Sequence, residues 1–154
     1  MGATYTPRSA AGTVAQININ ATVATAARLS ISAGWTDVPG IEGIQPFGSA
    51  KGIIDVTPLS ETQAKQFVDD VPDPGELAFS SFSDLENDVH QYLQYQANNV
   101  GGIDEWRVKP HLRSKMYHMN AFVTECKPSF AKSKGQMFDV KAKITGAVTV
   151  VDAS

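Results

Sequence analysis

The feature that most constrains the fold is an alternation of apolar and polar residues across residues 137–151. The apolar positions are Phe138, Val140, Ala142, Ile144, Val148 and Val150, and the polar positions between them include Lys141, Lys143, Thr145 and Thr149. Successive side chains of a β-strand point to opposite faces, so this pattern predicts a long strand with one buried face. A strand of this kind requires a sheet around it and a core beneath it.

Shorter alternations predict the neighbours of this strand. Residues 15–23 and 29–35 alternate in the same way and could form a hairpin through residues 24–28. The other strands are predicted at residues 41–44, 77–82, 106–108 and 117–124. Residues 127–136, which contain Pro128 and Gly135, are predicted to be the connection that leads into the last strand.

The segment between the strands at 41–44 and 77–82 has weaker signals. Residues 53–57 could be a strand or an extended loop edge, and residues 60–68 could hold one or two helical turns. Residues 71–76 are predicted to form a turn, because two prolines fix φ and a glycine accepts a positive φ.

One helix is predicted, over residues 83–98. Ser83 can cap its first turn while Glu86 reaches back to complete a capping box, and Gly101 and Gly102 follow its end. Many antiparallel strands with one helix predict a mainly β fold, in which two packed antiparallel sheets form a sandwich or partly rolled barrel with one flanking α-helix. The chain of 154 residues suits one domain, residues 1–154, with an N-terminal arm at residues 1–12.

The charges divide sharply along the chain. Residues 29–105 carry thirteen acidic and two basic side chains, a net charge of −11, whereas residues 106–154 carry nine basic and three acidic ones, a net charge of +6. Opposite charges could face each other within one fold. Alternatively, an acidic surface could meet a basic one between identical subunits, since complementary potentials fix register and partner choice.

No motif for catalysis or metal binding stands at a useful spacing. His90, His111 and His118 lack an HExxH or paired Cys–His pattern and are expected to be surface or partner contacts. The acid pairs Asp69–Asp70 and Asp104–Glu105 are expected to be exposed to solvent. We therefore predict no enzyme activity, no catalytic residues, no metal and no cofactor.

Further properties narrow the class of protein. The lone Cys126 excludes an internal disulfide and is expected to pack in the core or at a strand end. No apolar run approaches the roughly 18 residues of a membrane span, and residues 1–12 lack the apolar core of a signal peptide. A pI of 5.5 argues against a nucleic-acid-binding domain. An acidic, polar surface instead suits the passage of DNA, since each neutralised phosphate would add affinity.

Several segments, taken in order, resemble the major tail tube proteins of long-tailed (siphovirus-type) bacteriophages, which share a superfamily with type VI secretion tubes. They are GWTDVPGIEGI, KGIIDVTPLSE, QAKQFVDDVPDPGELAFSSF, DLENDVHQYLQYQ and the last pair of long strands. The resemblance implies a homo-hexameric ring with a β-barrel lumen, and rings that stack into a hollow tube through which DNA passes during ejection into the host.

The resemblance also implies partners, a location and contact residues. The partners would be the tail terminator, the distal tail or tip proteins and the tape measure protein, with no membrane contact. The location would be the virion tail, after synthesis in the host bacterial cytoplasm. Residues 45–63 would form an extended inter-subunit loop that reaches the next subunit or ring. Its expected contact residues are Gln45, Pro46, Phe47, Gly48, Lys51, Ile53, Ile54 and Asp55.

Two alternatives remain open at this point. The chain could be an inner-tube subunit of a contractile tail, a type VI secretion system or a gene transfer agent, because the fold is shared among them. It could instead be a monomeric β-barrel module that binds a ligand in an apolar pocket.

Overall fold

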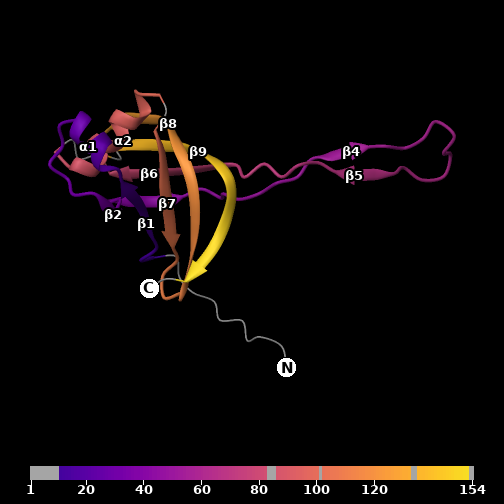
Figure 1. The fold of residues 1–154 in the computed structure, drawn as a ribbon, viewed down its shortest axis with the longest axis horizontal. Coiled ribbons are helices and arrows are strands. Elements are labelled where there is room, and N and C mark those ends of the chain that lie inside the picture. Colours follow the sequence, from indigo (N-terminus) through magenta and orange to yellow (C-terminus); the bar gives the residue numbers. More distant parts are fainter. Residues whose placement is uncertain (1–10, 83–85, 101, 133–134, 153–154) are drawn as a thin grey trace.

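The computed structural model describes residues 11–82, 86–100, 102–132 and 135–152 (Figure 1). Nine strands and two helices lie in these ranges. In chain order they are β1 (Val14–Ile19), α1 (Ala21–Ala26), β2 (Gly34–Asp37), β3 (Ile41–Ile44), β4 (Ile53–Asp55), β5 (Phe67–Asp69), β6 (Glu76–Phe82), α2 (Asp88–Ala97), β7 (Ile103–Lys109), β8 (Lys115–Ala131) and β9 (Gly135–Asp152).

Seven strands form one antiparallel sheet in the order β2-β1-β7-β8-β9-β6-β3, which curls into a half-barrel (Figure 1). The strands β4 and β5 pair only with each other and form a second, small sheet. The predicted mainly β class and the partly rolled barrel are confirmed. The fold has two helices in the described ranges where the sequence predicted one.

The long strands β8 and β9 form the centre of the sheet. The strand predicted at residues 137–151 is confirmed, and Val140, Ala142 and Ile144 on its apolar face are buried. The connection predicted at residues 127–136 is wrong for most of its length. The strand β8 continues to Ala131, and Lys127 and Phe130 pair with Asp139 and Gln136 of β9. Pro128 is accommodated within β8, where it is paired in register with Phe138.

The core is formed by the apolar face of the sheet together with α2 and α1. The helix α2 packs against β8 and buries Val89, Tyr92 and Leu93, which the helical spacing had grouped on one face. The largest fully buried side chains are Trp106, Tyr92, Phe138, Ile17, Ile19, Leu77 and Leu93. Because burying a large apolar side chain contributes about 1.5–3 kcal/mol, these residues supply much of the driving force for folding.

The N-terminal connection differs from the predicted hairpin. β1 and β2 do pair antiparallel, but α1 stands between them and the alternation at residues 29–33 lies outside any strand. The cause is Asn20, whose Oδ1 accepts hydrogen bonds from the backbone N–H groups of Thr22 (2.9 Å) and Val23 (3.3 Å). An asparagine that caps in this way starts a helix and ends the strand before it.

The helix α2 begins later than predicted. Asn87 is its cap, with Oδ1 accepting from the backbone N–H groups of Val89 (2.9 Å) and His90 (3.4 Å). The predicted start at Ser83 is therefore wrong by several residues, and Ser83 itself lies outside the described residues. Asparagine and serine are comparable caps, so cap preference alone does not favour Ser83 over Asn87.

Candidate assembly surface

A narrow two-stranded ribbon leaves the body of the protein between β3 and β6, and we call residues 48–75 the projecting hairpin (Figure 1). Near its root, Ala50 and Asp73 exchange two backbone hydrogen bonds of 2.9 and 2.8 Å. Farther out β4 and β5 pair, and Val56 N–H donates to Gln66 O at 3.0 Å. The ladder holds the hairpin in an extended shape without packing against the sheet.

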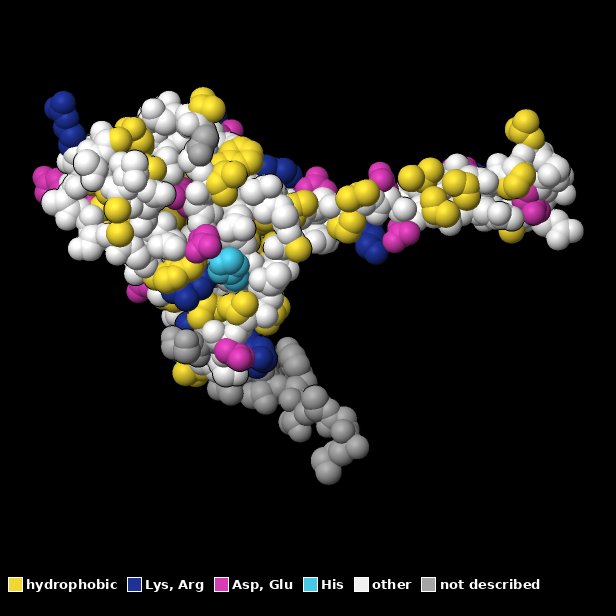
Figure 2. All heavy atoms as spheres, viewed as in Figure 1, with side chains coloured by type: hydrophobic (Ala, Val, Ile, Leu, Met, Phe, Trp, Pro, Cys, Tyr) yellow, Lys and Arg dark blue, Asp and Glu magenta, His cyan; other side chains and the backbone are white. Residues whose placement is uncertain are grey.

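The projecting hairpin exposes apolar side chains along its length (Figure 2). Ile53 is 75% exposed, Val71 81% exposed and Leu59 fully exposed, with further exposed side chains at Ile54, Val56, Phe67 and Val68. A two-stranded ribbon has no second layer that could cover such residues. Contiguous exposed apolar side chains mark a surface that contacts another molecule.

The projecting hairpin is also acidic, with five acidic and two basic residues between positions 48 and 75. The pKa of Asp55 is lowered by hydrogen bonds from the Thr57 side chain and backbone. The pKa of Glu61 is lowered by the backbone N–H groups of Gln63 and Ala64. The pKa of Asp73 is lowered by the backbone N–H of Gly75 and by Lys143. These carboxylates therefore remain charged at neutral and mildly acidic pH.

The root of the projecting hairpin is anchored to the sheet. The Phe47 ring meets the Tyr117 ring edge-on, with centroids 5.4 Å apart, and Asp73 Oδ1 lies 2.9 Å from Lys143 Nζ. Beside this root is an open hollow of about 760 Å³, lined by β3, residues 45–49 and side chains of β7, β8 and β9 that include Tyr117 and Val150. The hairpin thus starts from a fixed position on the body.

The structure divides the eight predicted contact residues into two groups. Gln45, Pro46, Phe47 and Gly48 lie at the root and line the hollow, whereas Lys51, Ile53, Ile54 and Asp55 lie out along the hairpin. The segment predicted as a loop at residues 45–63 is the outward half of the ribbon and its tip. The returning half was missed, because residues 60–68 were assigned helical turns instead of β5. Phe67 and Val68 are residue types that favour strands, and they were the sequence signal from which β5 could have been predicted.

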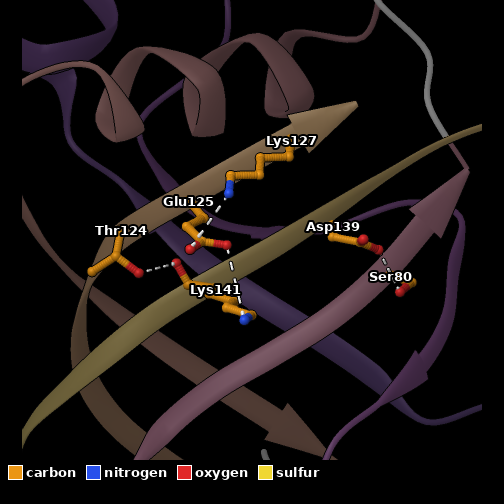
Figure 3. A network of polar contacts seen from close by, with 6 residues as sticks. All are labelled: Ser80, Thr124, Glu125, Lys127, Asp139 and Lys141. Carbon is orange, nitrogen blue, oxygen red and sulfur yellow. Dashed lines mark hydrogen bonds and ion pairs between the residues drawn. The ribbon is translucent and has the colours of Figure 1, made fainter. Parts of the chain in front are cut away.

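A different exposed surface covers the outward face of β6, β8 and β9 (Figure 3). Glu125 lies 3.8 Å from Lys127 Nζ and 3.9 Å from Lys141 Nζ. On the neighbouring strand Ser80 Oγ donates to Asp139 Oδ1 at 2.8 Å. This face is polar, and Glu125 pairs with one lysine of its own strand and with one of the neighbouring strand β9.

The ion pairs are formed mainly within each charged half of the chain. Lys51–Asp69 lies in the acidic half, while Lys115–Asp152 and the two pairs with Glu125 lie in the basic half. Lys143–Asp73 joins the two halves. Folding of one chain therefore leaves the acidic residues of the projecting hairpin and the basic residues of the C-terminal half, residues 106–154, at different places on the surface.

The side chains considered for chemistry take structural roles. His90 was expected at the surface, but it is buried, with its ring centroid 4.4 Å from that of Phe138. Asp104 was expected to be exposed, but it is buried beside Tyr92 and Gln96. Cys126 packs against the core as predicted, and burial raises the pKa of its thiol to about 11.

The described ranges also contain no metal site of the usual kind. His, Cys, Asp and Glu side chains in them nowhere gather in a group of three that could hold an ion. None of the helices seen in these ranges is long and apolar enough to cross a membrane.

Comparison with solved structures identifies the fold. A chain of the anti-feeding prophage baseplate, a six-fold symmetrised structure, superposes with a TM-score of 0.71 and 8% sequence identity over 96% of this chain and 97% of that chain. The chain has the fold of a tail-assembly component. A chain in the sheath/tube terminator of an extracellular contractile injection system gives a TM-score of 0.68 at 9% identity, over 97% and 99% of the two chains.

A third match comes from a gene transfer agent. A chain in the tail of an empty gene transfer agent particle, a structure with C6 symmetry, gives a TM-score of 0.62 at 14% identity, over 88% of this chain and 94% of that chain. The similar structures are tail, baseplate and terminator assemblies and not enzymes. No protein-family model matches the sequence, and a search of curated proteins finds no match.

Proposed function

We propose that this protein is a structural subunit of a phage-type tail tube, in which six copies form a ring and rings stack into a hollow tube. The shared fold with tail-assembly components supports the tail role. Two of the similar structures have sixfold symmetry, which supports a ring of six. The proposal places the protein in the tail of a virion or tail-like particle, after synthesis in a bacterial host.

The observation that carries the proposal is the projecting hairpin. It holds apolar residues such as Ile53, Leu59 and Val71 away from the body, where no part of the described chain covers them. A two-stranded ribbon on its own is only marginally stable in water, so burial by a neighbouring molecule would stabilise it. A chain that assembles with copies of itself supplies that neighbour in every repeat.

The similar structures come from a prophage baseplate, a contractile injection system and gene transfer agents, so they support the wider tail-tube class. Within that class the siphovirus tube is the assignment that the sequence motifs favour, and the inner tube of a contractile system is the second candidate. Copurification with a sheath protein would favour the contractile system.

Passage of DNA requires a wall that does not retain phosphates. The outward face of β6, β8 and β9 balances its charges, because Glu125 lies beside Lys127 and Lys141 and Asp139 is paired in register with Lys127 (Figure 3). Each lysine left unopposed would add affinity for DNA through counterion release. We assign this face to the lumen, and the ends of the tube to contacts with the terminator, tip and tape measure proteins.

The test compares the full chain with a variant that lacks the hairpin. In the variant, an Asn-Gly turn replaces residues 51–72, so that the hydrogen-bonded pair Ala50 and Asp73 closes a two-residue hairpin. We expect the full chain to form rings and tubes in negative-stain electron microscopy, and the variant to form no tubes. Unchanged far-ultraviolet circular dichroism, corrected for length, would show that the variant folds.

Two outcomes would contradict the proposal or limit it. A full chain that stays monomeric in analytical ultracentrifugation at high concentration would contradict the assembly role. The hollow of about 760 Å³ beside Phe47 would then favour a monomeric ligand-binding module. Tubes formed by the shortened variant would show that the hairpin is not needed for stacking.

A further inference from the structure

We infer that the projecting hairpin of one copy docks on the turn of residues 109–115 of a second copy, with acidic and apolar groups of the hairpin meeting basic and apolar groups of the turn. This inference rests on the proposed function and names the partner surface for the hairpin. We call residues 109–115 the basic turn. It joins β7 to β8 at the end of the sheet near the C-terminus (Figure 1).

The basic turn concentrates positive charge. Lys109, Arg113 and Lys115 lie within seven residues, together with His111, and no acidic residue stands among them. Lys115 is paired with Asp152. The projecting hairpin carries the opposite charge, with five acidic and two basic residues. Complementary charges of this kind guide association and fix the register of the partners.

Leu112 gives the basic turn an apolar contact point at a conformational cost. Its φ is 58°, in the left-handed region, and its side chain is 65% exposed. A residue with a Cβ pays about 1–2 kcal/mol for this conformation. Neither the strain nor the exposure of a leucine benefits an isolated subunit. Arg28 has the same left-handed φ, but at Leu112 this φ coincides with an exposed apolar side chain among cations, and that combination supports a contact role.

The surface around Leu112 is also hollowed. A depression of about 330 Å³ lies among Gly12, Val14, Pro110, Leu112 and Arg113, together with Lys109 and His111. Its lining combines apolar residues, such as Val14 and Leu112, with the cations Lys109 and Arg113. The hairpin tip presents the matching arrangement, with Leu59 fully exposed and Glu61 two residues away.

The two surfaces cannot meet within one molecule. The projecting hairpin extends from one side of the body, and the basic turn lies at a separate end of the sheet (Figure 1). A contact between them joins two different patches of two copies, so it is heterologous. Contacts of this type repeat from copy to copy and build rings or open stacks.

Charge exchange tests the docking. One variant carries Lys109→Glu and Arg113→Glu, a second carries Glu61→Lys and Asp70→Lys, which keeps the ion pair between Lys51 and Asp69, and a third carries all four substitutions. We expect each double variant to reduce the yield of tubes at least about tenfold and the fourfold variant to recover it, because like charges repel and exchanged charges attract. Tubes at the full yield in both double variants, or no recovery in the fourfold variant, would overturn the inference.

A second pair of variants tests whether misfolding, and not lost docking, reduces the yield of tubes. Leu112→Gly removes the apolar contact and the left-handed strain together, so tube yield should fall without a lower midpoint of thermal unfolding. Arg28→Gly is the matched control, since Arg28 is exposed with a φ of 59° but follows α1, which lies away from the turn between β7 and β8 (Figure 1). It should leave tube yield unchanged. Equal tube yields for both glycine variants would count against docking at Leu112.

These outcomes separate the two proposals. If the unmodified chain forms tubes that none of the charge or glycine variants diminish, the proposed function stands and the docking surface is wrong. If the unmodified chain forms neither rings nor tubes, the proposed function is wrong and the docking inference falls with it.

Discussion

Tyr92 on α2 and Asp104 on β7 are joined by a buried hydrogen bond in which Tyr92 Oη donates to Asp104 Oδ1 over 2.8 Å. The other carboxylate oxygen accepts from Gln96 Nε2 at 2.8 Å, and Tyr92 Oη accepts from the backbone N–H of Asn20 at 3.2 Å. Asp104 is only 3% exposed. This network ties α2 to the sheet and to the residue that caps α1.

Replacing Tyr92 by phenylalanine tests the strength of this network. The substitution leaves Asp104 Oδ1 without its donor and Asn20 N–H without its acceptor. Because an unsatisfied buried polar group costs about 1–3 kcal/mol, we expect the free energy of unfolding in urea to fall by about that amount. Tyr95→Phe is the control and should change it by less than about 0.5 kcal/mol, since the Tyr95 side chain is half-buried and outside this network. Equal losses in both variants would contradict the role given to Tyr92.

Asp104 also predicts a pH dependence of stability. Burial raises its pKa above the ordinary value of 3.8, although hydrogen bonds from Tyr92 and Gln96 oppose this effect. The folded state thus favours the protonated carboxyl, so its stabilising contribution is complete below the unfolded pKa and is lost as pH rises through the folded pKa. Stability relative to Asp104→Asn, measured by urea unfolding, should therefore decline from about pH 4 upward.

For Asp73 the expected pH dependence of stability has the opposite sign to that for Asp104. Its pKa is lowered, first by the backbone N–H of Gly75, so its contribution is present above the unfolded pKa and is lost as pH falls below about 4. The stability difference between the full chain and Asp73→Asn should shrink on acidification. A difference that grew on acidification would contradict this assignment.

The fold was predictable where the sequence contained a single uninterrupted alternation of apolar and polar residues. The alternation of β9 predicted both its length and its buried face, because side chains such as Val140 and Ile144 had only one apolar layer to join. The prediction failed where a single polar side chain redirected the backbone. Asn20 and Asn87 cap the two helices, and neither position stands out from other asparagines in the sequence.

The candidate assembly surface was predictable in part. Pro46 and Gly48 predicted the end of β3, and the structure places them at the root of the projecting hairpin, with Ile53 and Ile54 farther out along it. The basic turn was not singled out, because three cations in a loop are common at a solvated surface. Only the positive φ and exposure of Leu112 distinguish it, and neither is visible in a sequence.

Gly75 lies at the root of the projecting hairpin, where a side chain should disturb the contact between the two strands. Its φ is 80°, and a Cβ there would lie 3.0 Å from the backbone oxygen of Gly48 on the opposite strand of the root. Gly146 has a φ of 81° with open space around it. We therefore expect Gly75→Ala to cost more than Gly146→Ala, which bears the left-handed cost of about 1–2 kcal/mol alone.

Amide hydrogen exchange and thermal unfolding would check this difference. Gly75→Ala should also speed exchange at Ala50 and Asp73, whose mutual hydrogen bonds close the root. Gly146→Ala should leave those two amides unchanged. Identical exchange at the root in both variants would show that the hairpin tolerates a side chain at Gly75.

The apolar face of β9 provides the last prediction. Val140 is fully buried between Phe79 of β6 and Cys126 of β8, with which it is paired in register. Val140→Asp would place a carboxylate in this core without a partner, and severe core changes of this kind cost more than about 4 kcal/mol, close to the whole stability of many domains. The variant should lack the β-sheet circular dichroism of the parent. Thr145→Asp, on an exposed position of the same strand, should stay folded with a loss below about 1 kcal/mol. A soluble Val140→Asp variant with the parent's melting midpoint would mean that this face of β9 is not the core.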